Sequence, residues 1–378
     1  MGYGAEGMKY RFQWNFPIIF SKHDPKKLYT FSNHVHRSTN EGQSWELLSG
    51  DLTRNDQEKL VSSGGPSTQD NTGVEYYCTI FAAQESPLKE DLMWVGSDDG
   101  LIHITQDGGQ NWENVTPTGM PEWTMINSIE PSAFDEGTCY VAGTRYKLGD
   151  FTPYLYKTAD YGKTWTKITS GIESEHFTRV VREDPKRKGL LYAGTETGMY
   201  ISFNDGANWE KFQLNLPIVP ITDLTIKENN LIVATQGRSV WIIDDLTVLH
   251  QLSSNDSAAN TKLFAPKDAY RTKGRARPKA NPSLTEGQNH PSGVVTHFYL
   301  KNYDKKQDTI QLTYLSMAGD TLANFSTKAT DKKKTLKLEK GGNTHNWDTR
   351  GKGAERLKGM ILWWANLLVN RIGKFRGS

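Results

Sequence analysis

Four short segments of the chain share one residue spacing, and this repeat restricts the fold more than any other feature of the sequence. Each segment has Ser or Thr, then Asp or Asn, then Gly and finally Trp at fixed intervals. The segments are STNEGQSW (38–45), TQDGGQNW (105–112), TADYGKTW (158–165) and SFNDGANW (202–209). Short stretches of alternating apolar and polar residues lie on both sides of every segment. The pattern predicts two antiparallel strands joined by a hairpin turn, four times over.

The residue types of the repeat suit a structural role in that turn. An Asp or Asn side chain can accept hydrogen bonds from nearby backbone N–H groups. Gly supplies a positive φ, and Trp buries a large ring against the hairpin. We therefore expect these residues to stabilise the turns and the tryptophans to be largely buried. The set is Ser38, Asn40, Gly42, Trp45, Asp107, Gly109, Trp112, Asp160, Gly162, Trp165, Asn204, Gly206 and Trp209.

Two further strand-like stretches precede each hairpin, so each repeating unit has four strands. A fifth unit at 221–252 keeps the strand pattern but lacks the Asp-type turn. Five four-stranded units describe the blades of a β-propeller, which must stack because one blade cannot bury both of its faces. We expect an all-β chain with a propeller segment at 8–252, in an incomplete ring. Exposed apolar side chains are then expected on the first blade, at Phe12, Trp14, Phe16, Ile18 and Ile19.

The sequence after residue 252 has a different character. Residues 253–292 have the Ser, Asn, Pro, Lys and Gly content of a linker. Alternation returns at 293–302, 308–317, 334–340 and 344–351, which predicts a small immunoglobulin-like β-sandwich at 293–366. The closing strand departs from that pattern, so we expect a truncated sandwich and a poorly packed tail at 367–378. The apolar segment at 360–368 is too short to span a bilayer, and a membrane-surface role is its alternative interpretation.

Charge and composition exclude several classes of function. The net charge of +2 combines +13 over residues 252–378 (23 Lys and Arg against 10 Asp and Glu) with −11 over residues 1–251. The basic residues are scattered over strand-like sequence rather than interleaved with stacking aromatics, so we expect no nucleic-acid partner. The two cysteines, Cys78 and Cys139, exclude a disulfide scaffold and are interpreted as small buried residues on strands, with a disulfide as the alternative. No phosphate loop or metal motif is present, and we expect no cofactor and no metal.

The repeats resemble the Asp-box, or bacterial neuraminidase repeat, of sialidases, xyloglucanases and the sortilin propeller. The stretches GSDDGLIHITQDGGQNWENVTPTGMPEW, GTRYKLGDFTPYLYKTADYGKTW and ATQGRSVWIIDDL are similar to large bacterial proteins of the sortilin-like or "glycosyl hydrolase" type. The resemblance covers about residues 8–252 and corresponds to the C-terminal half of such proteins. It implies upstream blades as partners in the intact protein. It also implies a secreted, periplasmic or cell-surface location, although this sequence shows no signal peptide.

Blade topology brings one set of polar residues together. The connections between the second and third strands and the connections between blades should both lie at one end of the blades. The repeat turns should lie at the opposite end. We call the end without the repeat turns the rim. The residues expected there are Asn33, His34, Asp98, Asp99, Trp123, Arg145, Tyr146, Arg179, Glu196 and Arg238. A mixed-charge surface that carries aromatics suits a polar ligand, here a peptide or a glycan; bracing of neighbouring blades is the alternative role.

No catalytic set is evident in the sequence. Glycosidases use two carboxylates about 5–10 Å apart, and the carboxylates available for this role are Asp98, Asp99, Glu196 and Glu75. Sialidase-type chemistry would instead need an arginine cluster with a Tyr nucleophile, for which Arg145, Tyr146, Arg179 and Arg238 offer only matching residue types. The sequence therefore favours a non-catalytic ligand-binding module of sortilin-like type. A glycoside hydrolase fragment, sialidase- or xyloglucanase-like, is the alternative.

Overall fold

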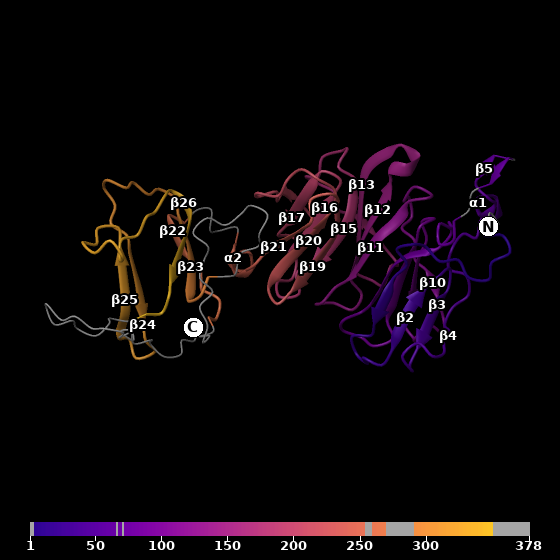
Figure 1. Cartoon of the computed structure of the whole chain (residues 1–378), viewed down its shortest axis with the longest axis horizontal. Helices are drawn as coiled ribbons and strands as arrows, with labels where there is room; N and C mark the ends of the chain where they lie inside the picture. The colour runs from indigo at the N-terminus through magenta and orange to yellow at the C-terminus, as the bar shows by residue number, and fades with distance from the viewer. Residues whose placement is uncertain (1–3, 66, 70–71, 254–258, 270–290, 351–378) are drawn as a thin grey trace, which may run out of the picture. The chain divides into compact units, whose positions relative to one another are not determined.

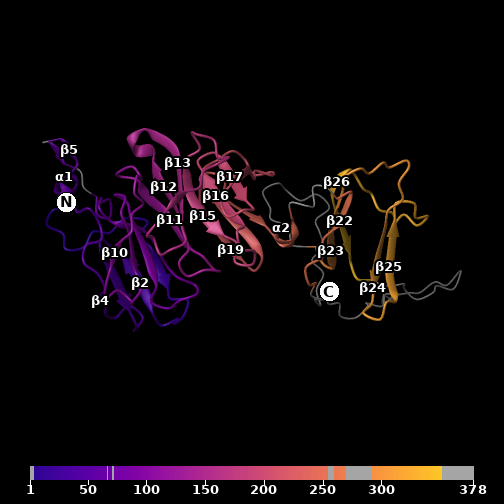
Figure 2. The ribbon, with the colours of Figure 1, turned by 180° about the vertical axis from the view of Figure 1, so that it is seen from behind.

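The computed structural model describes residues 4–65, 67–69, 72–253, 259–269 and 291–350. Its contacts divide the chain into two compact units, Met1–Ile243 and Asp244–Ser378. The first unit contains all four repeats, and its early strands (β2 to β4, within 28–47) and its last strands (β19 to β21, within 221–243) lie towards opposite ends of the unit in two opposite views (Figures 1 and 2). The second unit carries the remaining strands and one short helix.

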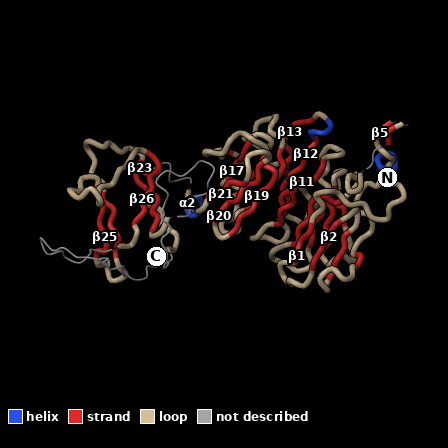
Figure 3. The backbone as a smooth tube through the Cα atoms, in the orientation of Figure 1, coloured by secondary structure: helices blue, strands red, loops and turns tan. Residues whose placement is uncertain are grey.

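Within its described residues, the first unit has four antiparallel sheets of four strands, one of three and a separate two-stranded hairpin (Figure 3). Every one is a meander in which consecutive strands pair. The first sheet comprises β1 (Ile18–Phe20), β2 (Leu28–Phe31), β3 (Val35–Ser38) and β4 (Glu46–Leu47), and the second comprises β7 (Ile80–Glu85), β8 (Met93–Ser97), β9 (Ile102–Thr105) and β10 (Glu113–Asn114). The third comprises β11 (Met125–Pro131), β12 (Cys139–Arg145), β13 (Asp150–Thr158) and β14 (Thr166–Lys167). The fourth comprises β15 (Thr178–Glu183), β16 (Leu191–Thr195), β17 (Gly198–Ser202) and β18 (Glu210–Lys211), and the fifth β19 (Ile221–Lys227), β20 (Asn230–Thr235) and β21 (Val240–Ile243).

Neighbouring sheets of this unit pack face to face through apolar side chains. Alternate residues of a strand point to opposite faces, so each inner sheet contributes to two cores. In β8, Val95 belongs to the core shared with the first sheet, and Trp94 to the core shared with the third. The close approach requires small residues, since a Cβ on Gly96 would lie 2.4 Å from the side chain of Ile126. The all-β prediction is confirmed, and stacked four-stranded meanders are the arrangement typical of propeller blades.

The fifth sheet differs from the sequence prediction, because it lacks the expected fourth strand. Residues 244–252 instead contain the helix α2 (Thr247–Gln251), and the carboxylate of Asp245 accepts a hydrogen bond from the backbone N–H of Thr247 at 2.9 Å. No strand of the fifth sheet pairs with the first sheet among the described residues. Ile18 and Phe20 on the first sheet and Trp14, four residues before it, are exposed. Phe12, Phe16 and Ile19, which were expected to be exposed with them, are partly buried.

Short elements lie in the connections between strands of the first unit. The helix α1 (Gln57–Leu60) and the hairpin of β5 (Gly64–Gly65) with β6 (Thr68–Gln69) lie between the first and second sheets. The 3-10 helix η1 (Tyr146–Leu148) joins β12 to β13.

The second unit consists of two small sheets that share an apolar core. One sheet has β22 (Thr261–Leu263), β23 (Val294–Leu300) and β26 (Gly341–Trp347), and the other has β24 (Gln311–Leu315) and β25 (Thr321–Ser326). Phe298 and Leu312 meet in the core, and the rings of Tyr314 and Trp347 lie 4.6 Å apart.

Several sequence expectations for this unit need correction. The segment 334–340, expected as a strand, forms none, although its Leu336 and Leu338 are buried in the core. The strands β22 and β25 were not anticipated, and β22 lies within the range expected as a linker. The immunoglobulin-like assignment stays a prediction. The tail at 367–378 and the apolar segment at 360–368 lie outside the described residues.

Candidate functional site

The four repeat turns lie between the third and fourth strands of the first four sheets, and their polar side chains bind the turn backbone. In the second sheet Thr105 Oγ1 donates to Asp107 Oδ1 at 2.8 Å and accepts from the N–H of Gly109 at 2.9 Å. Asp107 Oδ1 also accepts from the N–H of Asn111 at 3.0 Å. Asn40, Asp160 and Asn204 accept the equivalent backbone bond at 2.9 Å. These carboxylates and amides therefore satisfy the turn rather than face a ligand.

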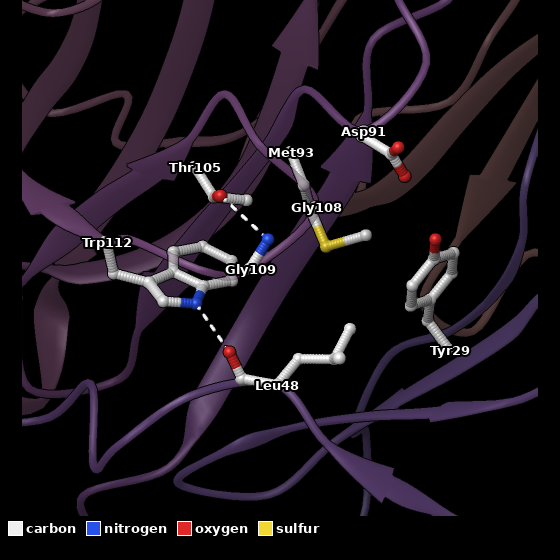
Figure 4. Close-up of a pocket in the computed structure, with 8 residues that line it drawn as sticks. All are labelled: Tyr29, Leu48, Asp91, Met93, Thr105, Gly108, Gly109 and Trp112. Atoms are coloured by element: carbon white, nitrogen blue, oxygen red, sulfur yellow. Dashed lines mark hydrogen bonds between the residues drawn. The ribbon is translucent and has the colours of Figure 1, made fainter.

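In three of the four turns, the tryptophan reaches back to the preceding sheet. The indole Nε1 of Trp112 donates to the carbonyl of Leu48 at 2.9 Å. Figure 4 shows this bond beside a small pocket between the first two sheets. Trp165 and Trp209 make the same bond at 2.7 Å, to the carbonyls of Val115 and Ile168 respectively.

These tryptophans differ in burial. Trp209 is 3% exposed, and Trp112 and Trp165 are partly buried. Trp45 was expected to be largely buried, but it is 44% exposed. The reason is that, within the described part of the chain, no sheet precedes its own to cover the ring as in the other three turns.

The residues expected at the rim occupy the connections at the opposite ends of the third strands. Asn33 and His34 lie between β2 and β3, Asp98 and Asp99 between β8 and β9, and Glu196 between β16 and β17. Arg145 ends β12, Tyr146 begins η1, and Arg238 lies between β20 and β21. Trp123 and Arg179 lie at the starts of β11 and β15. The strand phasing thus brings these positions to one end of their sheets, while their role in ligand binding stays a prediction.

Two aromatic stacks form on the rim, each covered by an arginine. In the first, the rings of Tyr77 and Trp123 stack at 5.9 Å with an interplanar angle of 24°. The guanidinium of Arg54 lies 5.1 Å from the Trp123 ring centroid, and the ammonium of Lys59 lies 5.7 Å from it. Cations over an indole face are attracted by its quadrupole. We call these four residues the tryptophan platform.

The second stack lies between the third and fourth sheets. The rings of Tyr146 and Phe177 stack at 5.1 Å and 12°, and Arg179 lies 5.2 Å from the Tyr146 centroid. Arg179 forms an ion pair with Glu196 at 2.7 Å, which holds the guanidinium over the rings. Phe151, half exposed, lies 6.0 Å from Phe177. We call this group the tyrosine platform.

Asp98 and Asp99 are almost fully buried beside the tryptophan platform, since both carboxylates affect Tyr77 and Asp99 contacts Arg54. Asp98 is 3% exposed, and its two oxygens accept from the N–H and the hydroxyl of Thr79, each at 2.8 Å. Burial raises the pKa of Asp98 to about 7, although the Thr79 bonds oppose the change. Burial, together with the negative charge of Asp98 and Asp99, raises the pKa of Tyr77. Asp98 is therefore a carboxyl group that can hold a proton near neutral pH.

Asp99 has a more structural set of partners. Its Oδ1 accepts from Ser97 Oγ at 2.5 Å and its Oδ2 from the N–H of Arg54 at 2.8 Å. Burial raises its pKa too, and these hydrogen bonds counteract the rise. Because Arg54 also donates from Nε to the carbonyl of Asp99, this carboxylate holds the arginine that covers Trp123.

The remaining rim residues mostly brace loops. Arg145 pairs with Asp150 at 2.6 Å, and despite burial the hydrogen bonds of Tyr154, Thr152 and Arg145 lower the pKa of Asp150. Asn33 donates to Asp51 at 2.8 Å, and His34 packs edge-on to Tyr10 at 5.5 Å. Arg238 is exposed and donates to the neighbouring Gly237 carbonyl. Glu75 accepts from the indole of Trp14 at 3.1 Å.

Sequence reasoning missed Tyr77, Arg54 and Phe177. A signal existed for two of them: the stretches YCTI (77–80), WTMI (123–126) and FTRV (177–180) all place an aromatic and a buried Thr at the start of the first strand of a sheet or just before it. Arg54 has no such signal, because its partners lie 45 residues or more along the chain.

No group of three or more His, Cys, Asp or Glu side chains able to hold a metal occurs among the described residues. Cys78 and Cys139 are free and buried, and burial raises the pKa of Cys78 to about 12. Cys139 lies on β12 as expected, whereas Cys78 lies in a bend at φ +58° rather than on a strand. No helix within the described part of the chain is long and apolar enough to cross a membrane.

Comparison with known proteins gives limited likenesses. No family model matches the chain. A segment of 109 residues is 27% identical to an oligoxyloglucan-reducing end-specific xyloglucanase of Emericella nidulans. The match covers 27% of this chain and 13% of the relative. Two solved structures resemble it. An ancestral GH74 enzyme has 14% identity, a TM-score of 0.45, and coverage of 86% of this chain and 40% of that one. The GH74 xyloglucanase of Xanthomonas campestris has 13% identity, a TM-score of 0.44, and coverage of 82% and 45%. The chain thus spans less than half the length of each of these proteins.

Proposed function

We propose that this chain is part of a glycoside hydrolase that binds a glucan polysaccharide such as xyloglucan across the rim. The observation that carries the proposal is the tryptophan platform together with the buried carboxyl of Asp98 near its Tyr77. Aromatic side chains mixed with a few polar groups, here Arg54 and Lys59, are the lining that binding sites for small molecules use. The sequence match to a xyloglucanase supports the same reaction class.

Asp98 is the proposed general acid. An acid of this type must hold a proton at the working pH, and burial gives Asp98 a pKa of about 7. The other rim carboxylates are held by cations or loop donors: Glu196 by Arg179, Asp150 by Arg145, and Asp99 by Arg54 and Ser97. The second carboxylate that hydrolysis requires is therefore expected from a part of the protein that faces the rim. An extracellular, periplasmic or cell-surface location belongs to this proposal, because the substrate is a polysaccharide.

A non-catalytic binding module of sortilin-like type is the second candidate. It is favoured by one observation: both oxygens of Asp98 already accept hydrogen bonds from Thr79, and the residue is 3% exposed. In this reading the platforms bind a glycan or a peptide, and Asp98 only anchors its loop.

The test uses the full chain with xyloglucan oligosaccharides, binding measured by calorimetry and cleavage by chromatography of products. Trp123→Ala should weaken binding, by up to roughly tenfold for the loss of one stacking surface. Asp98→Asn should keep binding and abolish cleavage. The matched control is Asp107→Asn in the same sheet, because Asn already occupies the equivalent turn positions 40 and 204. Cleavage that survives Asp98→Asn would overturn the role of Asp98, and no binding of any oligosaccharide would overturn the proposed function.

A further inference from the structure

A buried carboxyl group, Glu183 at the end of β15, contacts the third sheet from the fourth. It is 4% exposed. Its Oε2 accepts a hydrogen bond from the hydroxyl of Ser132 at 2.7 Å and from the backbone N–H of Ala133 at 2.9 Å, just after β11. Its Oε1 has one hydrogen-bond partner among the described residues, the hydroxyl of Tyr140 on β12, at 3.4 Å. Each of these bonds joins the fourth sheet to the third.

The Tyr140 hydroxyl has a second and closer partner. Asp205, in the repeat turn of the fourth sheet, lies 2.5 Å from it through Oδ1. The ammonium of Lys157 on β13 forms an ion pair with the other carboxylate oxygen, Oδ2. A neighbouring cation favours the ionised form of a carboxyl group, so Asp205 is an acceptor and Tyr140 donates its proton to it.

The number of protons in this cluster decides the state of Glu183. Three oxygens follow one another: Glu183 Oε1, the Tyr140 hydroxyl oxygen and Asp205 Oδ1. Their two contacts need two protons, and a tyrosine hydroxyl supplies only one. Because that proton is directed at Asp205, the second must be carried by Glu183 Oε1 and donated to the Tyr140 oxygen. An ionised Glu183 would leave two sets of lone pairs facing each other in the interior, which is unfavourable.

The surroundings of Glu183 also favour its neutral form. Burial raises the pKa of Glu183, and the negative charge of Asp205 adds to the rise, while the hydrogen bonds from the third sheet oppose it. On the side of β11, Glu130 is a further carboxylate that repels Glu183, and it lies 3.6 Å from the guanidinium of Arg182.

We propose that Glu183 is a protonated acid that locks the fourth sheet to the third through Tyr140, and that the lock opens when this proton is lost. An unfolded glutamate titrates near pH 4.3. The stabilisation is therefore complete below about pH 4 and is lost as pH rises towards the raised pKa of folded Glu183. This inference stands independently of the proposed function.

The second sheet supplies a matched control residue. Glu85 is also the last residue of the first strand of its sheet, and it is 1% exposed. Its Oε2 accepts from the N–H of Lys22 at 3.0 Å and its Oε1 from the N–H of Asp91 at 3.4 Å, so this carboxylate needs no proton. Glu183→Gln keeps every contact, with the amide N–H directed at the Tyr140 oxygen. Glu85→Gln directs an amide N–H at a backbone N–H in either orientation.

The test measures chemical denaturation of the full chain from pH 4 to 8 for the parent and both variants. Relative to Glu183→Gln, the folding equilibrium constant of the parent should fall by up to about tenfold per pH unit from about pH 4.5 to the pKa of folded Glu183. At pH 4, Glu183→Gln should have the same denaturation midpoint as the parent. Glu85→Gln should lower the midpoint at every pH, because it leaves a buried donor without its acceptor.

Infrared spectroscopy detects the proton itself and does not depend on the folding of Glu183→Gln. At pH 5 the parent should show a band from a buried protonated carboxyl group, and its frequency should shift in Tyr140→Phe, because that variant removes the acceptor of the proton. The proposal is overturned if the parent and Glu183→Gln share one pH profile, if Glu183→Gln is as destabilising at pH 4 as Glu85→Gln, or if Tyr140→Phe leaves every such band unchanged.

Discussion

Replacing Trp209 with Phe tests the energetic role of the indole hydrogen bond between sheets. Trp209 is 3% exposed, and its bond to the Ile168 carbonyl is 2.7 Å long and buried. The variant keeps a ring in place but leaves that carbonyl without this donor, at a cost of about 1–3 kcal/mol. The smaller ring buries roughly 40 Å² less apolar surface, which adds about 1 kcal/mol. The expected loss in free energy of unfolding is therefore about 2–4 kcal/mol.

The measurement is urea unfolding of the full chain by circular dichroism, with calorimetry for the melting temperature. A loss of this size should lower the melting temperature by roughly 4–16 °C. The control is Trp45→Phe, which changes an exposed ring whose indole has no acceptor among the described residues, and this variant should stay within about 0.5 kcal/mol of the parent. Equal losses for the two variants would refute the reasoning, since stability would then depend on the turn itself rather than on the bond between sheets.

Three further predictions concern buried groups. Burial raises the pKa of Asp98 to about 7, so its protonated form stabilises the fold at low pH and that stability is lost as pH rises towards 7; Asp98→Asn should flatten this part of the stability curve measured from pH 4 to 8. Burial lowers the pKa of His103 to about 4, so stability is lost as pH falls from about 6.5 to 4; His103→Leu should lose less stability than the parent over that range, and an unchanged slope would contradict the assignment. Gly162→Ala should lower the free energy of unfolding by about 2–5 kcal/mol, because an alanine there has a positive φ of 85° and clashes with Val115. Gly42→Ala, at φ +82°, should lower it only by the strain of the positive φ, so chemical denaturation of both variants separates the two effects.

The repeat turns could be predicted because their structure depends on local chemistry at a fixed spacing. The bonds of Thr105, Asp107 and Gly109 join residues two to four positions apart. The rim positions followed as well, because strand alternation alone decides which end of a sheet each connection reaches.

Features that depend on neighbouring sheets were not predictable. Trp45 and Trp209 have the same sequence context, yet one is 44% exposed and the other 3%, because only the second has a sheet before it. Likewise, the roles of Asp98 and Arg54 depend on partners that are distant in sequence and that folding brings together. The fourth strand expected after β21 is replaced by the helix α2, whose first residue, Thr247, donates its N–H to the Asp245 carboxylate.

In the indole hydrogen bonds between sheets, the acceptor is always synthesised before the donor. In each bond the acceptor comes earlier in the chain than the donor, by 64 residues for Leu48 and Trp112, 50 for Val115 and Trp165, and 41 for Ile168 and Trp209. At a synthesis rate of about 5–20 residues per second, each acceptor leaves the ribosome roughly 2–13 s before its tryptophan. Every sheet can therefore form its hairpin before the next one arrives to lock onto it, and nascent chains arrested between these points should carry a growing stack of already closed sheets.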